Sequence, residues 1–505
     1  MLSLKPQISA KIYSGCYGGE INNVGDLVTV QIQCPHQSPS LAMKQILFLV
    51  DESGSMIQTM PIIRASLFAA RNSLLRLIGI NITQNLDLAT DLRPDLRPDL
   101  DELFSQECNA SIITFSATAS CKWDSIAACR ASSLSYSGES FTDAVNTLES
   151  ESSTNLGAAL TLAFQKKILN YATWIIILTD GKPNRGLYQT LEAFQEIMHK
   201  VPPETKIIPL GYSTDFDPEI LSILGTMIYL DSEESIPETL GSIMGEIVTC
   251  YGMNAYIHLP DIPKEEVGPD DLIILSDIIE PSRDLIGSRN IGCVYNDRKY
   301  LYGYLPWGNI KRPDRLKYGG LLGNVSYFDI MQRVNVSHDF VIEVDDGLIP
   351  DDIYEGYFEA SKGRIILDIF YRRKLGQLSV QYVNAIKTKI ADWKHEKATI
   401  HKQEILRIVG ANFNTRHEHM SAIGLATSAQ NQISYTNVGR YSTEAQRFGS
   451  ISASQDFRTS YHPSSVSLRT AGFVPITSSF PITRSIPITR SIPEVVIDRN
   501  LLDNI

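Results

Sequence analysis

Two uninterrupted apolar runs stand out in the pattern of hydrophobic and polar residues, and an acidic residue follows each of them. Ile46–Val50 is followed at once by Asp51, and Trp174–Leu178 is followed, after one threonine, by Asp180. An apolar run of this length without alternation is typical of a parallel strand that is buried on both faces of a sheet. The pattern therefore predicts two central strands whose carboxyl ends carry acidic side chains.

Strand and helix patterns alternate over residues 42–250. The predicted strands are 45–50, 110–115, 174–179, 206–210 and 227–230, with an antiparallel edge near 120–123. Helical patterns lie between them, the last at 236–248, and the segment from Ser140 to Asp143 is typical of a helix N-terminal cap. This rhythm predicts an α/β domain with a doubly wound, mostly parallel sheet.

Short β-like runs fill residues 251–350, one of them at 272–276, and turn signals separate them. This pattern favours an antiparallel β-sandwich. Residues 1–41 hold two more strand patterns, 7–13 and 27–33. Because two strands are not stable alone, we expect this pair to join the sheet of residues 251–350, with the α/β domain inserted between the two parts.

The C-terminal third has two patterns. Residues 351–430 are helical in pattern, with Val383, Ile386, Ile390 and Trp393 recurring at spacings of three and four, so we expect two or three helices. Residues 431–505 are rich in Ser, Thr, Asn and Pro and repeat the hexad PITRSI. Regular Pro and few clustered apolar residues predict a flexible tail there.

Length and charge limit the classes of protein to consider. A chain of 505 residues exceeds one ordinary core, and its 43% hydrophobic and 20% charged residues are globular values. Residues 1–350 carry 26 Lys and Arg against 43 Asp and Glu, a net charge of −17, whereas residues 351–505 carry 19 against 14, a net charge of +5. The acidic body disfavours nucleic acid as the main partner.

Cysteine usage indicates the compartment. The seven cysteines are scattered, odd in number and without a CxxC pair, which indicates free thiols in a reducing environment. The N-terminus lacks an apolar signal core, and no run approaches about 18 apolar residues. We therefore expect a cytoplasmic protein without a membrane span, and nothing in the sequence indicates its oligomeric state.

Oxygen-bearing side chains gather around the two predicted strand ends. Asp51, Ser53 and Ser55 alternate directly after the first strand, Asp180 follows the second, and Thr154 precedes the helix pattern that leads into the second. Small, hard oxygen ligands at the carboxyl end of a parallel strand suit a divalent cation such as Mg²⁺.

With these pieces in this order, the segment resembles a von Willebrand factor type A (VWA) domain. Asp51, Ser53, Ser55, Thr154 and Asp180 match all five positions of that family's metal-ion-dependent adhesion site (MIDAS). The resemblance implies that the three hydroxyls bind Mg²⁺ or Mn²⁺ directly while the two carboxylates complete or support the ligand shell. It also implies a protein partner that offers an Asp or Glu carboxylate to the metal. A β domain behind the VWA domain is likewise similar to what intracellular members of the family have.

The chain departs from the family pattern between the first helix and the strand at 110–115. An insertion at 85–108 contains a tandem Asp-Leu-Arg-Pro repeat, and its two prolines preclude a continuous helix. A loop of this length is usually functional or mobile. A sequence duplication without function is the alternative.

Three classes of function remain open. The first is a metal-dependent protein-interaction module, an adaptor or scaffold, and the second is a structural component of a large assembly in which the metal site is incidental. An enzyme is the third and is disfavoured, because the chain has neither a Gly-x-Ser-x-Gly elbow nor a P-loop. Glu52 is adjacent to the site, but alternation along the strand directs its side chain away from the ligand set.

Overall fold

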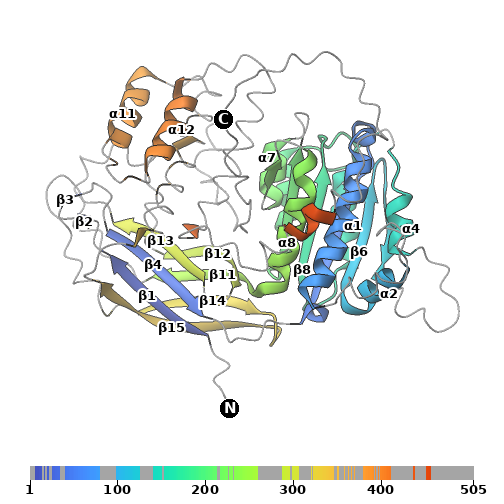
Figure 1. The fold of residues 1–505 in the computed structure, drawn as a ribbon, viewed down its shortest axis with the longest axis horizontal. Helices are drawn as coiled ribbons and strands as arrows, with labels where there is room; N and C mark the ends of the chain where they lie inside the picture. The colour runs from blue at the N-terminus through green and yellow to red at the C-terminus, as the bar shows by residue number, and fades with distance from the viewer. Residues whose placement is uncertain are drawn as a thin grey trace.

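The fold is described from a computed structural model of the whole chain. The structure describes residues 6–13, 16–17, 20–21, 26–33, 40–79, 98–125, 140–150, 153–212, 217–225, 227–230, 233–259, 287–295, 298–305, 320, 322–345, 350–351, 379–391, 398–410, 436–437 and 451–456, with single residues at 358, 362, 365, 366, 369, 393 and 396. Two sheets form the body of the protein (Figure 1).

The first sheet has six strands in the order β10-β9-β8-β5-β6-β7. Every strand is parallel to its neighbours except β7, which pairs antiparallel with β6. The strands are β5 (Lys44–Asp51), β6 (Asn109–Phe115), β7 (Ala119–Asp124), β8 (Ala172–Thr179), β9 (Thr205–Tyr212) and β10 (Ile228–Leu230). The predicted strands and the antiparallel edge are confirmed.

Helices cover both faces of this sheet, as the prediction of a doubly wound fold requires (Figure 1). One face is covered by α1 (Met60–Leu77), α2 (Pro98–Glu107), α4 (Phe141–Asn146) and α8 (Ile236–Thr249), and the other by α5 (Leu156–Lys166), α6 (Leu191–Met198) and α7 (Pro218–Leu224). Short 3-10 turns are η1 (Leu41–Met43), η2 (Gly54–Ile57) and η4 (Glu233–Ser235).

The side chains of β5 explain why its apolar run has no polar alternation. Ile46, Phe48 and Val50 pack among the helices of one face, while Leu47 and Leu49 pack among those of the other. Successive residues of a strand point to opposite faces, so both sets must be apolar when helices cover both sides.

The insertion at 85–108 ends in helix α2. Leu100 and Phe104 of this helix are buried in the core, and Asp101 forms a buried ion pair with Arg71 of α1. Phe104 stacks on Trp123 of β7 with ring centroids 5.6 Å apart. The last ten residues before Cys108 are therefore structural, whereas the tandem repeat before Pro98 lies outside the described residues.

The second sheet has eight strands in the order β12-β11-β14-β15-β1-β4-β13-β16. They are β1 (Gln7–Tyr13), β4 (Asp26–Gln33), β11 (Cys250–Leu259), β12 (Gly287–Tyr295), β13 (Arg298–Leu305), β14 (Leu322–Asp329), β15 (Val334–Asp345) and β16 (Thr436–Asn437). A separate two-stranded ribbon consists of β2 (Cys16–Tyr17) and β3 (Glu20–Ile21). The strand expected at 272–276 lies outside the described residues.

The two N-terminal strands pair within this second sheet, where the sequence placed them. β4 lies antiparallel between β1 and β13, while β1 lies parallel to β15. The parallel pair corrects the expectation of a purely antiparallel sheet. It arises because the long excursion of the chain through the first sheet lets β15 return in the same direction as β1, which a short hairpin does not allow.

The C-terminal region contains helices α11 (Val380–Ala391) and α12 (Ala398–Gly410). Of the predicted apolar seam, Ile386, Ile390 and Trp393 are buried. Beyond them, the predicted tail contains a packed element. Residues 451–456 are helical, and Ala453 is fully buried in the core that α1 and α8 share. The remaining residues after 437 lie outside the described part of the chain, where flexibility stays a prediction.

A bidentate ion pair holds residues 451–456 against α1. Arg76 Nη1 and Nη2 donate to the two carboxylate oxygens of Asp456 at 2.8 and 3.0 Å, and Nη1 also donates to Ser452 Oγ at 2.6 Å. Charge-assisted, bidentate pairs of this kind are the stronger hydrogen bonds in proteins.

We expect Asp456→Ala to release this segment. Removing both charge-assisted bonds should raise the population of the undocked segment about tenfold, so trypsin should cut faster at Arg447 and Arg458, which flank it in the sequence. The control is Lys200→Ala, which removes an exposed ion pair with Glu196 elsewhere. Equal cleavage rates in the two variants would show that Asp456 does not hold the segment.

Candidate functional site

The five predicted ligand residues come from three segments at the carboxyl edge of the first sheet. Asp51 is the last residue of β5, Ser53 and Ser55 lie in the turn that follows, and Asp180 follows β8. Thr154 directly precedes Asn155, the N-cap of α5. Strand β5 lies between β6 and β8 in the sheet. After β5, the chain forms β6 on one side of it and later β8 on the other side. In open α/β sheets, ligands bind at such a switch point.

Hydrogen bonds connect four of the five residues. Ser53 N–H donates to Asp51 Oδ1 at 2.8 Å, and the Ser53 and Ser55 hydroxyls lie 3.0 Å apart. The Ser55 hydroxyl donates to Asp180 Oδ1 at 2.7 Å. Ser53 and Ser55 thus bridge the Asp51 carboxylate at the end of β5 to the Asp180 carboxylate that follows β8.

Gly181 shows that Thr154 belongs to the same cluster. A Cβ placed on this glycine would lie 3.3 Å from Thr154 Oγ1, 3.7 Å from Asp51 Oδ2 and 3.7 Å from Ser55 Oγ. Oxygens of Asp51, Ser55 and Thr154 therefore lie around one small space beside Gly181, and the Ser55 hydrogen bond connects Asp180 to them. The structure brings all five predicted residues together.

Exposure differs across the cluster. Asp51, Ser53, Thr154 and Asp180 are buried, whereas Ser55 is exposed to solvent. The cluster therefore has a rigid inner side, fixed by the strand ends, and an outer side at which a further oxygen ligand from outside the protein has access.

Burial shapes the electrostatics of this edge. Desolvation raises the pKa of Asp51 to about 7, the nearby charge of Asp180 adds to the rise, and the hydrogen bonds from Thr179 and Ser53 oppose it. The pKa of the Tyr212 phenol is also raised, first by burial and then by the charges of Asp180, Asp51 and Glu233. Several acidic groups thus act on one buried region, where a cation would favour their charged forms.

Two supporting residues were not predicted from the sequence. The Thr179 hydroxyl donates to Asp51 Oδ2 at 2.6 Å and fixes the second oxygen of that carboxylate. Asn184 holds Thr154 by two bonds, since its side-chain oxygen accepts from Thr154 N at 2.9 Å and its own N–H donates to Thr154 O at 3.1 Å. Their position on either side of Asp180 and Gly181 could have marked both residues as neighbours of the site. Their roles could not be predicted, because they depend on contacts between segments that are distant in the sequence.

The donor set fits a hard divalent cation. Three neutral hydroxyls and two carboxylates supply oxygen only, as Mg²⁺ and Mn²⁺ prefer. Among the described residues, no group of three or more His, Cys, Asp or Glu side chains is placed to hold a metal ion. A metal at this edge would therefore depend on the Ser and Thr hydroxyls.

Glu52 is not part of the cluster. Its Oε1 accepts from the backbone N–H of Glu149 at 3.0 Å, and its own N–H donates to Phe115 O at 2.8 Å. The side chain is buried and engaged with the segment before Thr154. Glu52 therefore binds the backbone at Glu149, in the segment before Thr154.

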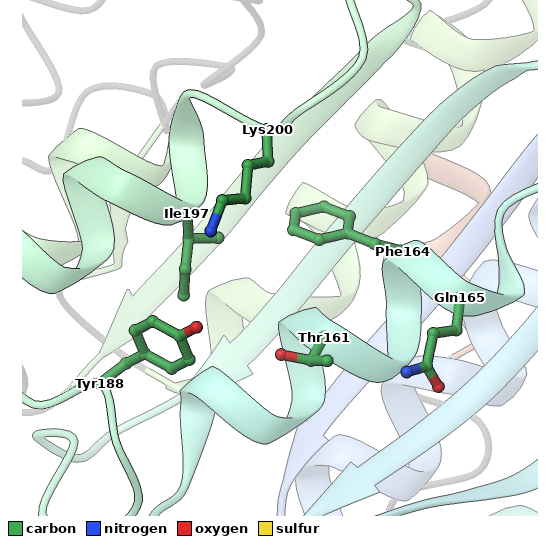
Figure 2. A pocket seen from close by; sticks show the side chains of 6 residues that line it. All are labelled: Thr161, Phe164, Gln165, Tyr188, Ile197 and Lys200. Atoms are coloured by element: carbon green, nitrogen blue, oxygen red, sulfur yellow. The ribbon is translucent and has the colours of Figure 1, made fainter.

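A separate surface pocket of about 410 Å³ lies between α5 and α6. Figure 2 shows the side chains that line it, namely Thr161, Phe164, Gln165, Tyr188, Ile197 and Lys200. None of these is one of the five clustered residues, so the pocket and the strand-end cluster are different features.

Comparisons with known proteins give structural similarities only. No protein-family model and no curated protein matches the chain. The chain is similar to the ArnB paralog VWA2 from Sulfolobus acidocaldarius (15% identity, 84% of this chain, 98% of that chain, TM-score 0.43) and to von Willebrand factor type A from Catenulispora acidiphila (13%, 85%, 97%, 0.47). A third similar structure is proximal thread matrix protein 1 from the mussel byssus with a zinc-occupied MIDAS motif (11%, 44%, 51%, 0.28).

Within the part of the chain that the structure describes, no helix combines the length and the apolar character that a membrane crossing needs.

Proposed function

We propose that the chain is a VWA-type protein-interaction module that acts as an adaptor or scaffold. Asp51, Ser53, Ser55, Thr154 and Asp180 would hold Mg²⁺ or Mn²⁺, and an Asp or Glu side chain of a protein partner would complete the coordination. The observation that carries the proposal is the cluster beside Gly181, where oxygens of Asp51, Ser55 and Thr154 lie close together and the exposed Ser55 donates to Asp180.

The ligand types support binding rather than catalysis. When most direct ligands are neutral hydroxyls, a bound cation keeps much of its charge and attracts an anionic ligand. Metal-assisted hydrolysis would need a general base beside the ion. The acidic residue next to the cluster, Glu52, is engaged with the Glu149 backbone instead. We therefore propose a binding function without a reaction, in a cytoplasmic protein.

Charge adds selectivity. Residues 1–350 carry 26 basic against 43 acidic residues, a net −17, so an acidic partner is repelled by most of this surface and attracted at the cation. Such a combination would favour a precisely placed carboxylate over loose contacts with an acidic surface.

The test compares four conditions, wild type and Thr154→Ala, each with Mg²⁺ and with EDTA. Thr154→Ala removes one hydroxyl without adding bulk. We expect proteins captured by the immobilised wild-type chain in Mg²⁺ to be retained at least about tenfold less by Thr154→Ala or in EDTA. The matched control is Thr161→Ala, which removes a hydroxyl from the separate pocket.

Equal capture in all four conditions would contradict the proposal. It would instead support the alternative function, a structural component of a large assembly that uses the second sheet, the helices or the tail for contacts while the metal site is incidental.

A further inference from the structure

Two large apolar side chains beside the strand-end cluster are exposed to solvent. Ile57, two residues after Ser55, is 68% exposed. Leu187, in the loop that follows Asp180, is 91% exposed, the highest value among the exposed large apolar side chains that the structure describes. Single exposed apolar residues are common on protein surfaces. These two differ from such residues because each lies in a segment that begins with residues of the cluster.

The two side chains belong to opposite sides of the cluster. Ile57 ends the turn η2, which leads into α1 on one face of the first sheet. The loop 181–190 leaves β8 and contacts the start of α5 on the other face, where Asn184 binds both backbone polar groups of Thr154. The cluster at the strand ends therefore lies between two segments that each expose an apolar side chain.

The loop that exposes Leu187 is packed against α5 on both sides of this residue. Gly186 has a φ of +91°, and a Cβ at this position would lie 2.3 Å from Asn155 Oδ1, so the close approach to the start of α5 requires glycine. Tyr188 packs so closely on Gly157 that a Cβ there would lie 2.6 Å from Tyr188 Cδ2. Leu187 is therefore held in solvent by a well-packed loop, and such preorganisation lowers the cost of binding.

The same loop carries two basic side chains. Lys182 and Arg185 are exposed, and within the described part of the chain neither forms an ion pair. Residues 53–58 and 181–190 contain two basic and no acidic residues, whereas residues 1–350 as a whole carry 26 basic against 43 acidic residues. A local basic surface on an acidic body attracts an acidic group of a partner to this edge of the sheet.

We propose that the protein partner binds through a short exposed segment in which the metal-binding Asp or Glu is flanked by apolar side chains and by a second acidic residue. This inference rests on the proposed function of the strand-end cluster. Ile57 and Leu187 contact the apolar side chains of the segment, and Lys182 and Arg185 bind its second carboxylate. A single carboxylate does not distinguish one acidic protein from another, so the contacts around the cluster select the partner.

The probe is a set of short synthetic peptides, each with one Asp that is flanked by Leu, Ser or Glu in every combination. Their binding to the full chain in Mn²⁺ is measured by fluorescence anisotropy. We expect peptides with both Leu and Glu beside the Asp to bind at least about tenfold more tightly than peptides with Ser alone, because burial of an apolar side chain against Ile57 or Leu187 contributes about this much.

Variants of the loop assign the preference to its side chains. Leu187→Ser should weaken the preference for Leu, and the double variant Lys182→Gln, Arg185→Gln should remove the preference for Glu. Neither variant changes a candidate metal ligand, so affinity for Mn²⁺ should stay within a few-fold of wild type. The matched controls are Leu169→Ser, at a residue 79% exposed just before β8 at the opposite edge of the sheet, and Lys200→Gln, at an exposed residue after α6. Both controls should bind the peptides as wild type does.

Equal affinity of the wild-type chain for all peptides, or no binding of any of them, would overturn the inference. A preference for Leu and Glu that is unchanged in Leu187→Ser and in the double variant would overturn it as well, because another surface would then select the peptides. Failure of the proposed function gives a different result. Peptide binding would then be the same in Mn²⁺ and in EDTA, whatever residues flank the Asp.

Discussion

Replacing Asp101 with alanine is expected to lower the free energy of unfolding of the first domain by about 3–5 kcal/mol, because it would remove the carboxylate that forms an ion pair with the buried Arg71 guanidinium. Arg71 is 1% exposed and lies over the rings of Phe68 and Phe141 at 5.2 and 5.4 Å. Its ion pair with Asp101 offsets part of the cost of burying this charge.

Asp101 also anchors a second helix. Its Oδ2 accepts from the backbone N–H of Thr142 at 2.8 Å, at the start of α4, while Arg71 Nη1 donates to Thr142 Oγ1 at 3.3 Å. One carboxylate therefore joins α1, α2 and α4. Asp101→Ala should loosen the packing of Phe104 on Trp123, so tryptophan fluorescence should report the loss along with the shift in the denaturant midpoint.

The matched control is Glu102→Ala. Glu102 is the next residue of α2, has the same charge and is exposed, so its removal should change stability by less than about 0.5 kcal/mol. If the two variants had the same midpoint, α2 would not be a structural part of the domain. The insertion from which it comes would then be a loop without a role in the core.

The first sheet was predictable because its signal is local. Ile46–Val50 is apolar at every position since helices cover both faces, and this leaves a pattern that can be read without a structure. The grouping of the five candidate ligand residues was predictable for the same reason. Each lies beside a predicted strand or helix end, and strand ends of a parallel sheet meet at one edge.

What escaped prediction depends on contacts between distant segments. Thr179 is one polar residue at a strand end, and only the register of β8 against β5 brings its hydroxyl to Asp51. Asp101 lies in an insertion with no apolar pattern long enough to predict a packed helix. Ala453 and Asp456 lie in a Ser- and Thr-rich stretch, and their docking depends on Arg76, which is separated from Asp456 by 380 residues.

Strand direction in the second sheet could not be inferred either. The alternating patterns of β1 and β15 predict strands with one buried face, but alternation is the same for parallel and antiparallel neighbours. The direction is fixed by the path of the chain between them, which passes through the whole first domain.

Asp51→Asn is expected to lower affinity for Mg²⁺ or Mn²⁺ by at least about 100-fold, on the proposal that this carboxylate supports the ligand shell, because even outer-shell partners of metal ligands contribute 10–100-fold. The fold should survive. An amide can still accept from Ser53 N, which Asp51 Oδ1 does at 2.8 Å, and the Thr179 hydroxyl can accept as well as donate.

The measurement is calorimetric titration of Mn²⁺ into the wild-type chain, Asp51→Asn and Glu52→Gln. Glu52→Gln removes the same charge from the next residue, and its side chain still accepts from Glu149 N, so metal affinity should stay within a few-fold of wild type. Saturating metal should raise the unfolding temperature of wild type and Glu52→Gln, since a ligand that binds only the folded state stabilises it, and should leave Asp51→Asn unchanged. The metal-free wild-type chain should remain folded, because the apolar clusters that form the domain core include none of the five residues. If Asp51→Asn and Glu52→Gln bound Mn²⁺ equally well, the ion would be held by the general acidity of this surface, and the five residues beside Gly181 would not form its site.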